Sequence, residues 1–443
     1  MLGEYDRSSS KASFKMLEGL LDNIDINVAT VLDRALNGED ISVEQAVVLF
    51  DTTGLEYNAV LMTADELRRR AVGDLVTYVV NRNINFTNVC VKRCGFCAFS
   101  RDHRQEEGYM LPINEIVRRA KEAWDLGATE VCVQAGLPPK MPGDLYIRLC
   151  ESIKNEVPDI HVHGFSPEEV LYGSVRSKCT IKDYLRLLKG AGVGSLPGTS
   201  AEILDQDLRD KVSSGRISVD QWVDVITTAH ELGIPTTATI MYGFLETNLQ
   251  KARHIGLIRD IQKSSGGFTE FVPLSFVHTE APMYSQGFVD DVRKGPSGTE
   301  VLKMHAVARV MLNNWIHNIQ VSWVKEGLKL AQSLLVAGVN DMSGTLINES
   351  ISTAAGSQHG QMVKPSEFRQ IIRDAGRIPA ERYTTYKIRR TYDQDDNSQE
   401  ALDLVGGEAN RRFGSYSELV KTDRFRYKHP KYTDNIRESL PRS

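Results

Sequence analysis

Three cysteines within eight residues are the clearest chemical feature of the sequence. Cys90, Cys94 and Cys97 have C-x₃-C-x₂-C spacing in the segment NFTNVCVKRCGFCAFSR. Thiolates this close converge only if the loop wraps around a metal centre, and iron–sulfur clusters normally use four cysteine ligands. With three, one iron of a [4Fe–4S] cluster would lack a protein ligand. Such an open coordination position is what a metal centre needs in order to bind and activate a small molecule.

Two other metal sites are compatible with the same three thiols. A structural zinc ion would take His103 as its fourth ligand, and an electron-transfer cluster would take a remote fourth cysteine. The other cysteines, Cys132, Cys150 and Cys179, are scattered along the chain. Neither alternative explains why the three-cysteine segment directly follows a predicted strand, at the end where barrel enzymes carry their active sites. The open-site cluster is therefore the favoured interpretation.

An alternation of strand-like and helical segments predicts how the cysteine loop is held. Helices between successive strands favour parallel pairing with right-handed crossovers. Eight strands are expected, over residues 76–86, 129–134, 159–165, 193–198, 234–243, 267–276, 317–324 and 336–341. Their number and the length of chain that they span match a TIM-type (β/α)₈ barrel, an α/β fold, with a partial barrel as the alternative.

The composition divides the chain into three regions. Residues 1–75 are expected to form an N-terminal helical region, and residues 76–388 to form the barrel. Residues 389–443 are polar and charge-mixed with few aliphatic side chains, so we expect a C-terminal extension that is peripheral or partly mobile.

The cysteine segment resembles that of the radical S-adenosylmethionine superfamily, whose signature is Cys-x₃-Cys-x-aromatic-Cys. Phe96 occupies the aromatic position. The resemblance implies that Cys90, Cys94 and Cys97 are the cluster ligands, and that Phe96, or backbone near it, packs beside the adenine of S-adenosylmethionine. It also implies that the methionine moiety chelates the fourth iron, and that reduction then yields a 5′-deoxyadenosyl radical.

Other strand ends carry candidate binding groups for this cofactor. Superfamily members usually have Gly-Gly-Glu after the second strand, where this chain has Gln134, Ala135 and Gly136, so Gln134 is the candidate acceptor for the amino group. Glu202 can accept from ribose hydroxyls or from the ammonium, or can simply complement a helix dipole. Backbone of Met241, Tyr242 and Gly243 could meet the adenine, or form an ordinary turn.

Three titratable residues are candidates for catalysis on the substrate side. His161 and His163 lie on one side of a predicted strand, and His163 is nearer its carboxyl end, although a hydrogen-bonded core histidine is an equal interpretation. Glu270 lies on the sixth expected strand, and Asp341 ends the eighth. For Asp341, capping of a loop is the competing interpretation. Further polar candidates at strand ends are Ser166, Glu168, Glu169, Ser275, Ser322 and Glu349.

A resemblance to one subgroup of the superfamily extends over roughly residues 40–390, carried by segments such as GLPPKMPGDLY and GSLPGTSAEILDQDLRDKVSSGRIS. The subgroup contains the FO synthase subunit 2 family (CofH-type) and two menaquinone-pathway enzymes, aminofutalosine synthase and dehypoxanthine futalosine cyclase. The first family is the most similar. It implies transfer of the 4-hydroxybenzyl group of L-tyrosine to 5-amino-6-(D-ribitylamino)uracil in coenzyme F420 biosynthesis, with FO synthase subunit 1 as functional partner.

Composition and charge argue against a nucleic-acid-binding, membrane-spanning or secreted protein. The net charge is −5, with 53 basic and 58 acidic residues, so there is no basic excess to bind nucleic acid. No apolar run approaches the ~18 residues of a membrane helix. The first residues, MLGEYDRSSSKASFK, lack the apolar stretch of a secretory signal. We therefore expect a cytoplasmic protein.

Overall fold

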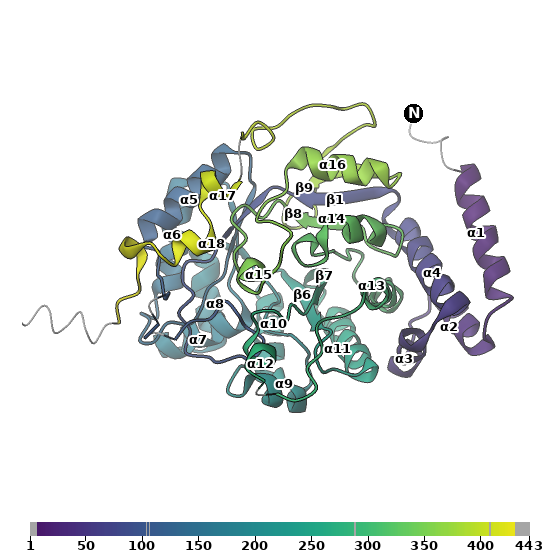
Figure 1. The fold of residues 1–443 in the computed structure, drawn as a ribbon, viewed down its shortest axis with the longest axis horizontal. Helices are drawn as coiled ribbons and strands as arrows, with labels where there is room; N and C mark the ends of the chain where they lie inside the picture. Colours follow the sequence, from purple (N-terminus) through teal and green to yellow (C-terminus); the bar gives the residue numbers. More distant parts are fainter. Residues whose placement is uncertain (1–6, 103, 106, 288, 407–408, 430–443) are drawn as a thin grey trace, which may run out of the picture.

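The computed structural model describes residues 7–429 except residues 103, 106, 288, 407 and 408. Four helices open the chain and lie beside the barrel at the edge opposite the C-terminal helices (Figure 1). They are α1 (Arg7–Leu21), α2 (Ile26–Leu36), α3 (Val43–Asp51) and α4 (Gly54–Val72). Helix α3 begins at a capping box, because the Ser42 and Gln45 side chains each accept from the other's backbone N–H.

Ten strands form three sheets in the described residues, and all but one of their pairings are parallel. They are β1 (Leu75–Val79), β2 (Asn81–Ile84), β3 (Glu130–Val133), β4 (His161–Gly164), β5 (Val193–Ser195), β6 (Thr236–Tyr242), β7 (Phe268–Ser275), β8 (Asp341–Gly344), β9 (Ile378–Arg382) and β10 (Ile388–Thr391). The strand orders are β10-β9-β1-β8, β2-β3-β4-β5 and β6-β7. Only β10 is antiparallel to its neighbour.

Single parallel bridges join the three sheets into a ring. Leu196 pairs with Thr236, Phe271 with Ile319, Gln320 with Asp341, and Arg82 with Ile347, which returns the order to β2. The expected α/β fold is confirmed, with the strand order of a barrel whose pairing is regular only within the three sheets.

Helices follow the strands, and most of them cover the outside of the ring, whereas α15 borders the cavity (Figure 1). They are α5 (Ile113–Asp125), α6 (Leu145–Glu156), α7 (Pro167–Ser177), α8 (Ile181–Gly190), α9 (Gln206–Ser213), α10 (Val219–Glu231), α11 (Asn248–Ser265), α12 (Pro282–Ser285), α13 (Gly298–Leu312), α14 (Trp323–Leu334), α15 (Ile351–Ala354), α16 (Pro365–Asp374), α17 (Ala409–Phe413) and α18 (Tyr416–Leu419). Their apolar faces and the strands enclose one continuous hydrophobic core, because each amphipathic helix must bury its apolar side.

The structure differs from the sequence prediction at three expected strands and adds two that were not expected. The first expected strand is split into β1 and β2, which pair with different sheets. The seventh, expected over 317–324, forms only the bridges at Ile319 and Gln320, and α14 already begins at Trp323. The eighth begins at Asp341, where the sequence predicted its end. Strands β9 and β10 were not predicted, because IPAER and IRRT lack the alternation of a half-buried strand.

The described part of the predicted C-terminal extension packs against the cysteine loop. We call residues 409–427 the C-terminal strap. Met110 N–H donates to the Phe425 carbonyl, and Tyr427 N–H donates to the Gly108 carbonyl, each at 2.8 Å. The Tyr416 ring lies 5.6 Å from that of Phe99, centroid to centroid. Aromatic residues of the strap, such as Tyr416 and Phe425, hold it in place, although the segment as a whole is polar.

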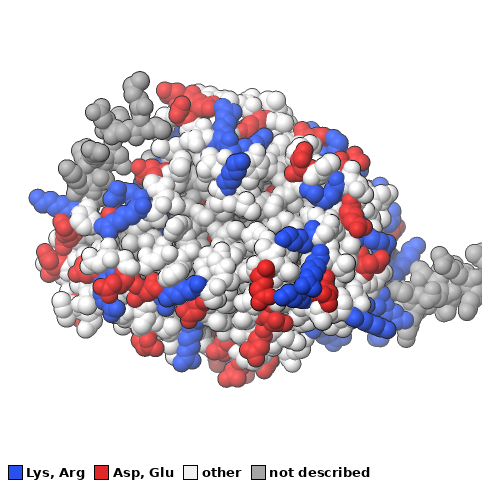
Figure 2. Space-filling model, turned by 180° about the vertical axis from the view of Figure 1, so that it is seen from behind, with Lys and Arg blue, Asp and Glu red and all other residues white. Residues whose placement is uncertain are grey.

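Basic and acidic side chains are interspersed on the face of the molecule seen in Figure 2, in line with the small net charge. None of the described helices is both long and apolar enough to span a membrane. The region boundaries at residues 75 and 388 stay predictions; strand β1 begins at Leu75 and β10 at Ile388.

Candidate active site

The loop after β2 carries the three cysteines and is fixed by one backbone hydrogen bond within the segment and by two to distant segments. Cys90 N–H donates to the Arg101 carbonyl at 3.0 Å, and Val91 N–H donates to the Leu137 carbonyl at 2.8 Å. Gly95 N–H donates to the Val212 carbonyl at 2.8 Å. Strand β2 is part of the ring, so its carboxyl end delivers the loop to the face where parallel barrels place their active sites.

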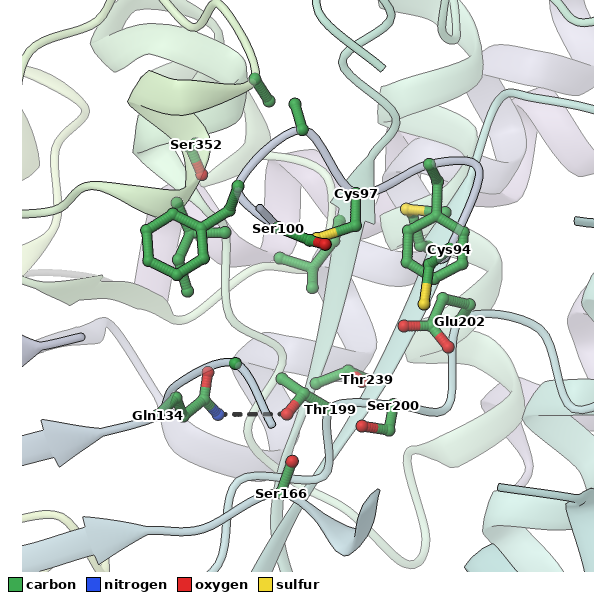
Figure 3. A pocket seen from close by; sticks show the side chains of 18 of the residues that line it. Cys94, Cys97, Ser100, Gln134, Ser166, Thr199, Ser200, Glu202, Thr239 and Ser352 are labelled. Carbon is green, nitrogen blue, oxygen red and sulfur yellow. Dashed lines mark hydrogen bonds between the residues drawn. The ribbon is translucent and has the colours of Figure 1, made fainter. Parts of the chain in front are cut away.

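All three thiols line a single cavity of about 360 Å³. None of them is in a disulfide, and none is fully exposed. In Figure 3 the Cys94 thiol points toward Glu202, while Cys97 lies beside Ser100 on the same loop. Among the described residues, no three His, Cys, Asp or Glu side chains gather as tightly as a single metal ion requires. His103, the alternative zinc ligand, lies outside the described residues.

The donor set fits an iron–sulfur cluster with an open iron. Cluster irons are bound by cysteine thiolates, each on a different iron, so the ligands need not share one central atom. Burial raises the pKa of the Cys94 thiol above its usual value, and the nearby guanidinium of Arg216 opposes this effect. Burial also raises the pKa of Cys90. A bound cation would favour the thiolate form of both.

Arg216 organises the wall beside the thiols. Its guanidinium lies 2.7 Å from Glu202 and 3.3 Å from Glu168, and it is positioned over the Phe96 ring at 5.3 Å from the centroid. Burial alone would lower the pKa of Arg216, but the carboxylates of Glu202 and Glu168 hold it above its usual value. Phe96, Glu202 and Arg216 thus form one connected group at the cavity.

Four of the six predicted cofactor residues line the cavity. These are Phe96, Gln134, Glu202 and Met241. Gln134 donates through Nε2 to the Thr199 hydroxyl at 3.1 Å, the contact drawn in Figure 3. Glu202 Oε2 is buried and accepts no hydrogen bond, although Arg209 Nη1 lies 3.5 Å away. Such an oxygen can accept from a ligand hydroxyl or ammonium.

Tyr242 and Gly243 are placed behind the wall rather than on it. The buried Tyr242 hydroxyl accepts a hydrogen bond from the Ser275 hydroxyl at 3.2 Å. Gly243 has φ of 93°, and a β-carbon there would come within 2.3 Å of Pro296. Only Met241 of this predicted group reaches the cavity.

A carboxylate does lie against the end of β3, where the sequence lacks the usual glutamate. Glu169, from α7 after the next strand, accepts from Ala135 N–H at 3.0 Å and from the Ser166 backbone and hydroxyl. Burial raises the pKa of Glu169 to about 7, and the bonds from Ser166 and Ala135 oppose the shift. Glu169 lines the cavity together with Ser166 and Glu168.

His163 lies outside the described cavity lining, in the barrel interior. Its Nδ1 is 2.7 Å from the Ser195 hydroxyl, which also contacts His161 Nε2 at 2.7 Å. Burial lowers the pKa of His163 to about 4, and the Glu130 carboxylate opposes the shift. The structure thus places His163 as a hydrogen-bonded core histidine.

Glu270 and Asp341 also lie away from the cavity, in a buried charge network. Arg382, from β9, contacts Asp341 through Nε at 2.5 Å and Nη2 at 3.1 Å. The same guanidinium is 3.6 Å from Glu270, which further accepts from Gln320 Nε2 at 2.7 Å and from the Tyr386 hydroxyl. Burial raises the pKa of Glu270, and Arg382 opposes the shift. These bonds occupy both carboxylates within the protein.

Several polar cavity residues were missed by sequence reasoning. Arg216 lies in one of the segments that carry the family resemblance, but nothing local in the sequence marked it as a cavity residue. Lys325 follows the seventh expected strand, and its position at a strand's carboxyl end could have identified it. The cavity also includes Asn83, Lys92, Thr199, Ser200 and Thr239.

Comparison with protein families agrees with this geometry. Residues 84–257 match the Radical SAM superfamily, and residues 265–395 match the CofH/MqnC C-terminal region. The chain therefore belongs to the radical SAM superfamily.

Curated relatives define the family more closely. The chain is 45% identical over 365 residues to the 5-amino-6-(D-ribitylamino)uracil–L-tyrosine 4-hydroxyphenyl transferase of Methanothermobacter thermautotrophicus, covering 82% of this chain and 98% of the relative. It is 46% identical over 353 residues to that of Methanocaldococcus jannaschii, covering 79% and 97%. The chain belongs to the family of these transferases.

Solved structures of similar fold are more distant in sequence. The [FeFe]-hydrogenase maturase HydG of Carboxydothermus hydrogenoformans superimposes with a TM-score of 0.63 at 17% identity, covering 86% of this chain and 85% of that one. Methylornithine synthase (PylB) has a TM-score of 0.57 at 16% identity, with 92% and 99% covered. These similarities support the α/β fold described above.

Proposed function

We propose that the protein joins the 4-hydroxybenzyl group of L-tyrosine to 5-amino-6-(D-ribitylamino)uracil, with release of 2-iminoacetate, 5′-deoxyadenosine and methionine. The observation that carries this function is the 45% identity, over 98% of its length, to a relative named for this reaction. The three-thiol cavity supplies the site that such chemistry requires.

Cys90, Cys94 and Cys97 would hold a [4Fe–4S] cluster, and Phe96, Gln134, Glu202 and Met241 would contact S-adenosylmethionine. When bound, the two groups supply the hydrogen-atom abstraction that begins the reaction. The protein orients them: Arg216 fixes the Glu202 carboxylate, and Thr199 fixes the Gln134 amide. Tyr242 and Gly243 support Met241 from behind.

The remaining cavity wall serves to position substrate and to exclude water from a radical reaction. Apolar side chains make up much of this wall, among them Leu137, Leu274, Phe276, Val324, Leu346 and Ile351. We assign no chemical step to His163, Glu270 or Asp341, because they lie outside the described cavity lining and bond to other protein groups.

The product is an adduct whose deazaflavin ring has still to close, and FO synthase subunit 1 is the proposed partner enzyme for that step. The two reactions together would give FO, the core of coenzyme F420, in the cytoplasm. This part of the proposal rests on the family and on the chemistry of the product.

The test is anaerobic incubation of the reconstituted protein with tyrosine, the diaminouracil, S-adenosylmethionine and dithionite, followed by mass analysis. The expected result is an adduct that carries the 4-hydroxybenzyl group, with 5′-deoxyadenosine formed in equal amount. A parallel incubation replaces both substrates with the precursors of aminodeoxyfutalosine. Deoxyadenosine release only in that second incubation would overturn the proposal in favour of a menaquinone-pathway activity.

A further inference from the structure

Lys325 is a cavity cation without a partner among the described residues. It lies in the first turn of α14 and lines the same cavity as the three cysteines. Within the described residues, its ammonium makes no hydrogen bond, and no carboxylate oxygen lies within 4 Å of it. The other two cations of the wall are paired: Lys92 is 3.3 Å from Glu168, and Arg216 is 2.7 Å from Glu202.

The carboxylates near Lys325 are already bound to other groups. Glu349 accepts from the Ser352 N–H at 2.8 Å and from the Thr353 N–H at 3.2 Å. Glu326 accepts from the Ser275 hydroxyl. Both carboxylates act on the Lys325 charge from a distance, while burial lowers the pKa of its ammonium. A partly buried ammonium without a direct partner is costly, and an anionic ligand group would relieve that cost.

The wall around Lys325 is separate from the candidate cofactor groups. Gln134 follows β3, Glu202 follows β5 and Met241 ends β6. Lys325 instead follows the bridge at Gln320, between the ends of β7 and β8. Its neighbours along the cavity wall on these elements are mainly apolar: Leu274, Phe276, Val324 and Leu346. This part of the site offers a single cation beside an apolar surface.

We infer that Lys325 binds the α-carboxylate of the amino-acid substrate, whose aromatic ring packs on the adjacent apolar wall. The inference rests on the proposed function and deepens it. An aromatic amino acid combines an anionic end with an apolar body, which is the pairing that this wall offers. Holding the carboxylate fixes Cα and Cβ relative to the cluster loop, so Lys325 determines which substrate bond is presented.

The test compares L-tyrosine with tyramine, which lacks only the carboxylate. Equilibrium binding to the reconstituted holoenzyme with S-adenosylmethionine is measured for wild type, Lys325→Met and Lys325→Arg. Lys329→Met is the matched control, because Lys329 is on the same helix but exposed. We expect wild type and the control to prefer tyrosine by about 10- to 100-fold, as for a charge-assisted hydrogen bond. Lys325→Met should bind the two ligands within about threefold of each other, and Lys325→Arg should regain part of the preference.

Two results would overturn the role of Lys325: an unchanged tyrosine preference in Lys325→Met, or no such preference in wild type. Iron content and S-adenosylmethionine affinity report whether each variant is assembled. If Lys325→Met fails to load the cluster, the role of Lys325 is still tested by the tyrosine preference of wild type and of Lys325→Arg. Failure of the wider function is separate, because a wild type that forms no 4-hydroxybenzyl adduct overturns the proposed reaction. If wild type forms the adduct and Lys325→Met keeps the same tyrosine preference, only the proposed role of Lys325 is overturned.

Discussion

The guanidinium of Arg216 and the carboxylate of Glu202 are 2.7 Å apart at the edge of the cysteine cavity. This ion pair uses one carboxylate oxygen and leaves Oε2 of Glu202 without a hydrogen bond. Arg216 also covers the Phe96 ring. One cation thus orients two of the proposed cofactor contacts and leaves one acceptor free for a ligand.

Glu202→Gln should weaken S-adenosylmethionine binding by about 10-fold, because an amide replaces the charged acceptor facing the ligand. The measurement is equilibrium binding to reconstituted protein, with iron content expected to stay unchanged. Glu231→Gln is the control, since that carboxylate pairs with Lys182 on the exposed surface. Unchanged affinity in Glu202→Gln would contradict the assignment.

Replacing any one of Cys90, Cys94 or Cys97 with alanine should abolish both cluster assembly and 5′-deoxyadenosine formation, because each thiolate holds a different iron. Iron and sulfide quantification with product analysis checks this. Cys179→Ala should retain both, because Cys179 is outside the described cavity lining. Turnover at the wild-type rate by Cys94→Ala would refute the ligand assignment.

Arg382→Met should lower the free energy of unfolding by about 3–5 kcal/mol, since it leaves buried carboxylates without their cation. The affected groups are Asp341 and Glu270. Urea unfolding of the cluster-free chain measures the change. Arg186→Met, which breaks an exposed pair with Asp183, should cost less than about 1 kcal/mol. Equal stability of Arg382→Met and wild type would show that the network is not structural.

His163 should make the protein less stable as the pH falls from 6.5 toward 4. Its folded pKa of about 4 lies below the usual 6.5, so within this window the unfolded chain binds a proton that the folded chain does not. The contribution to the slope of stability against pH is at most about 1.4 kcal/mol per pH unit. Urea unfolding across this range should show a shallower slope for His163→Gln than for wild type. Identical slopes would place the titration elsewhere.

Tyr416→Ala should speed the loss of iron to a chelator several-fold, because the C-terminal strap packs on the cysteine loop through this ring. The hydroxyl of Tyr416 also accepts from Asn88 Nδ2, at 3.4 Å. Tyr416→Phe keeps the ring and should stay near the wild-type rate. Equal rates in all three proteins would mean that the strap does not hold the loop.

The sequence was sufficient for the features that short spacing or regular alternation encodes. The cysteine spacing predicted the loop, and the alternation of strands and helices predicted the α/β fold. Glu202 and Gln134 were predicted because they follow expected strands of a barrel, and both line the cavity. Each of these signals is local in the chain.

Features that depend on tertiary contacts were not predictable in this way. Glu270 and Asp341 have the residue types of catalytic acids, and only the position of β9 reveals that Arg382 neutralises them in the interior. The strap is anchored by Phe425 and Tyr416, which a polar average conceals. Lys325 can be recognised only when the other cations of the described cavity lining, Lys92 and Arg216, are seen to be paired.

Strand β9 has a consequence for how the molecule is made. Arg382 follows its partner Asp341 by 41 residues, and β9 inserts beside β1, the first strand of the chain. During synthesis, Asp341 and Glu270 therefore lack their cationic partner until residue 382 has left the ribosome. The ring of strands can close once Ile347 has been made, but β9 covers the edge of β1 only later, so shorter nascent chains would need protection from aggregation.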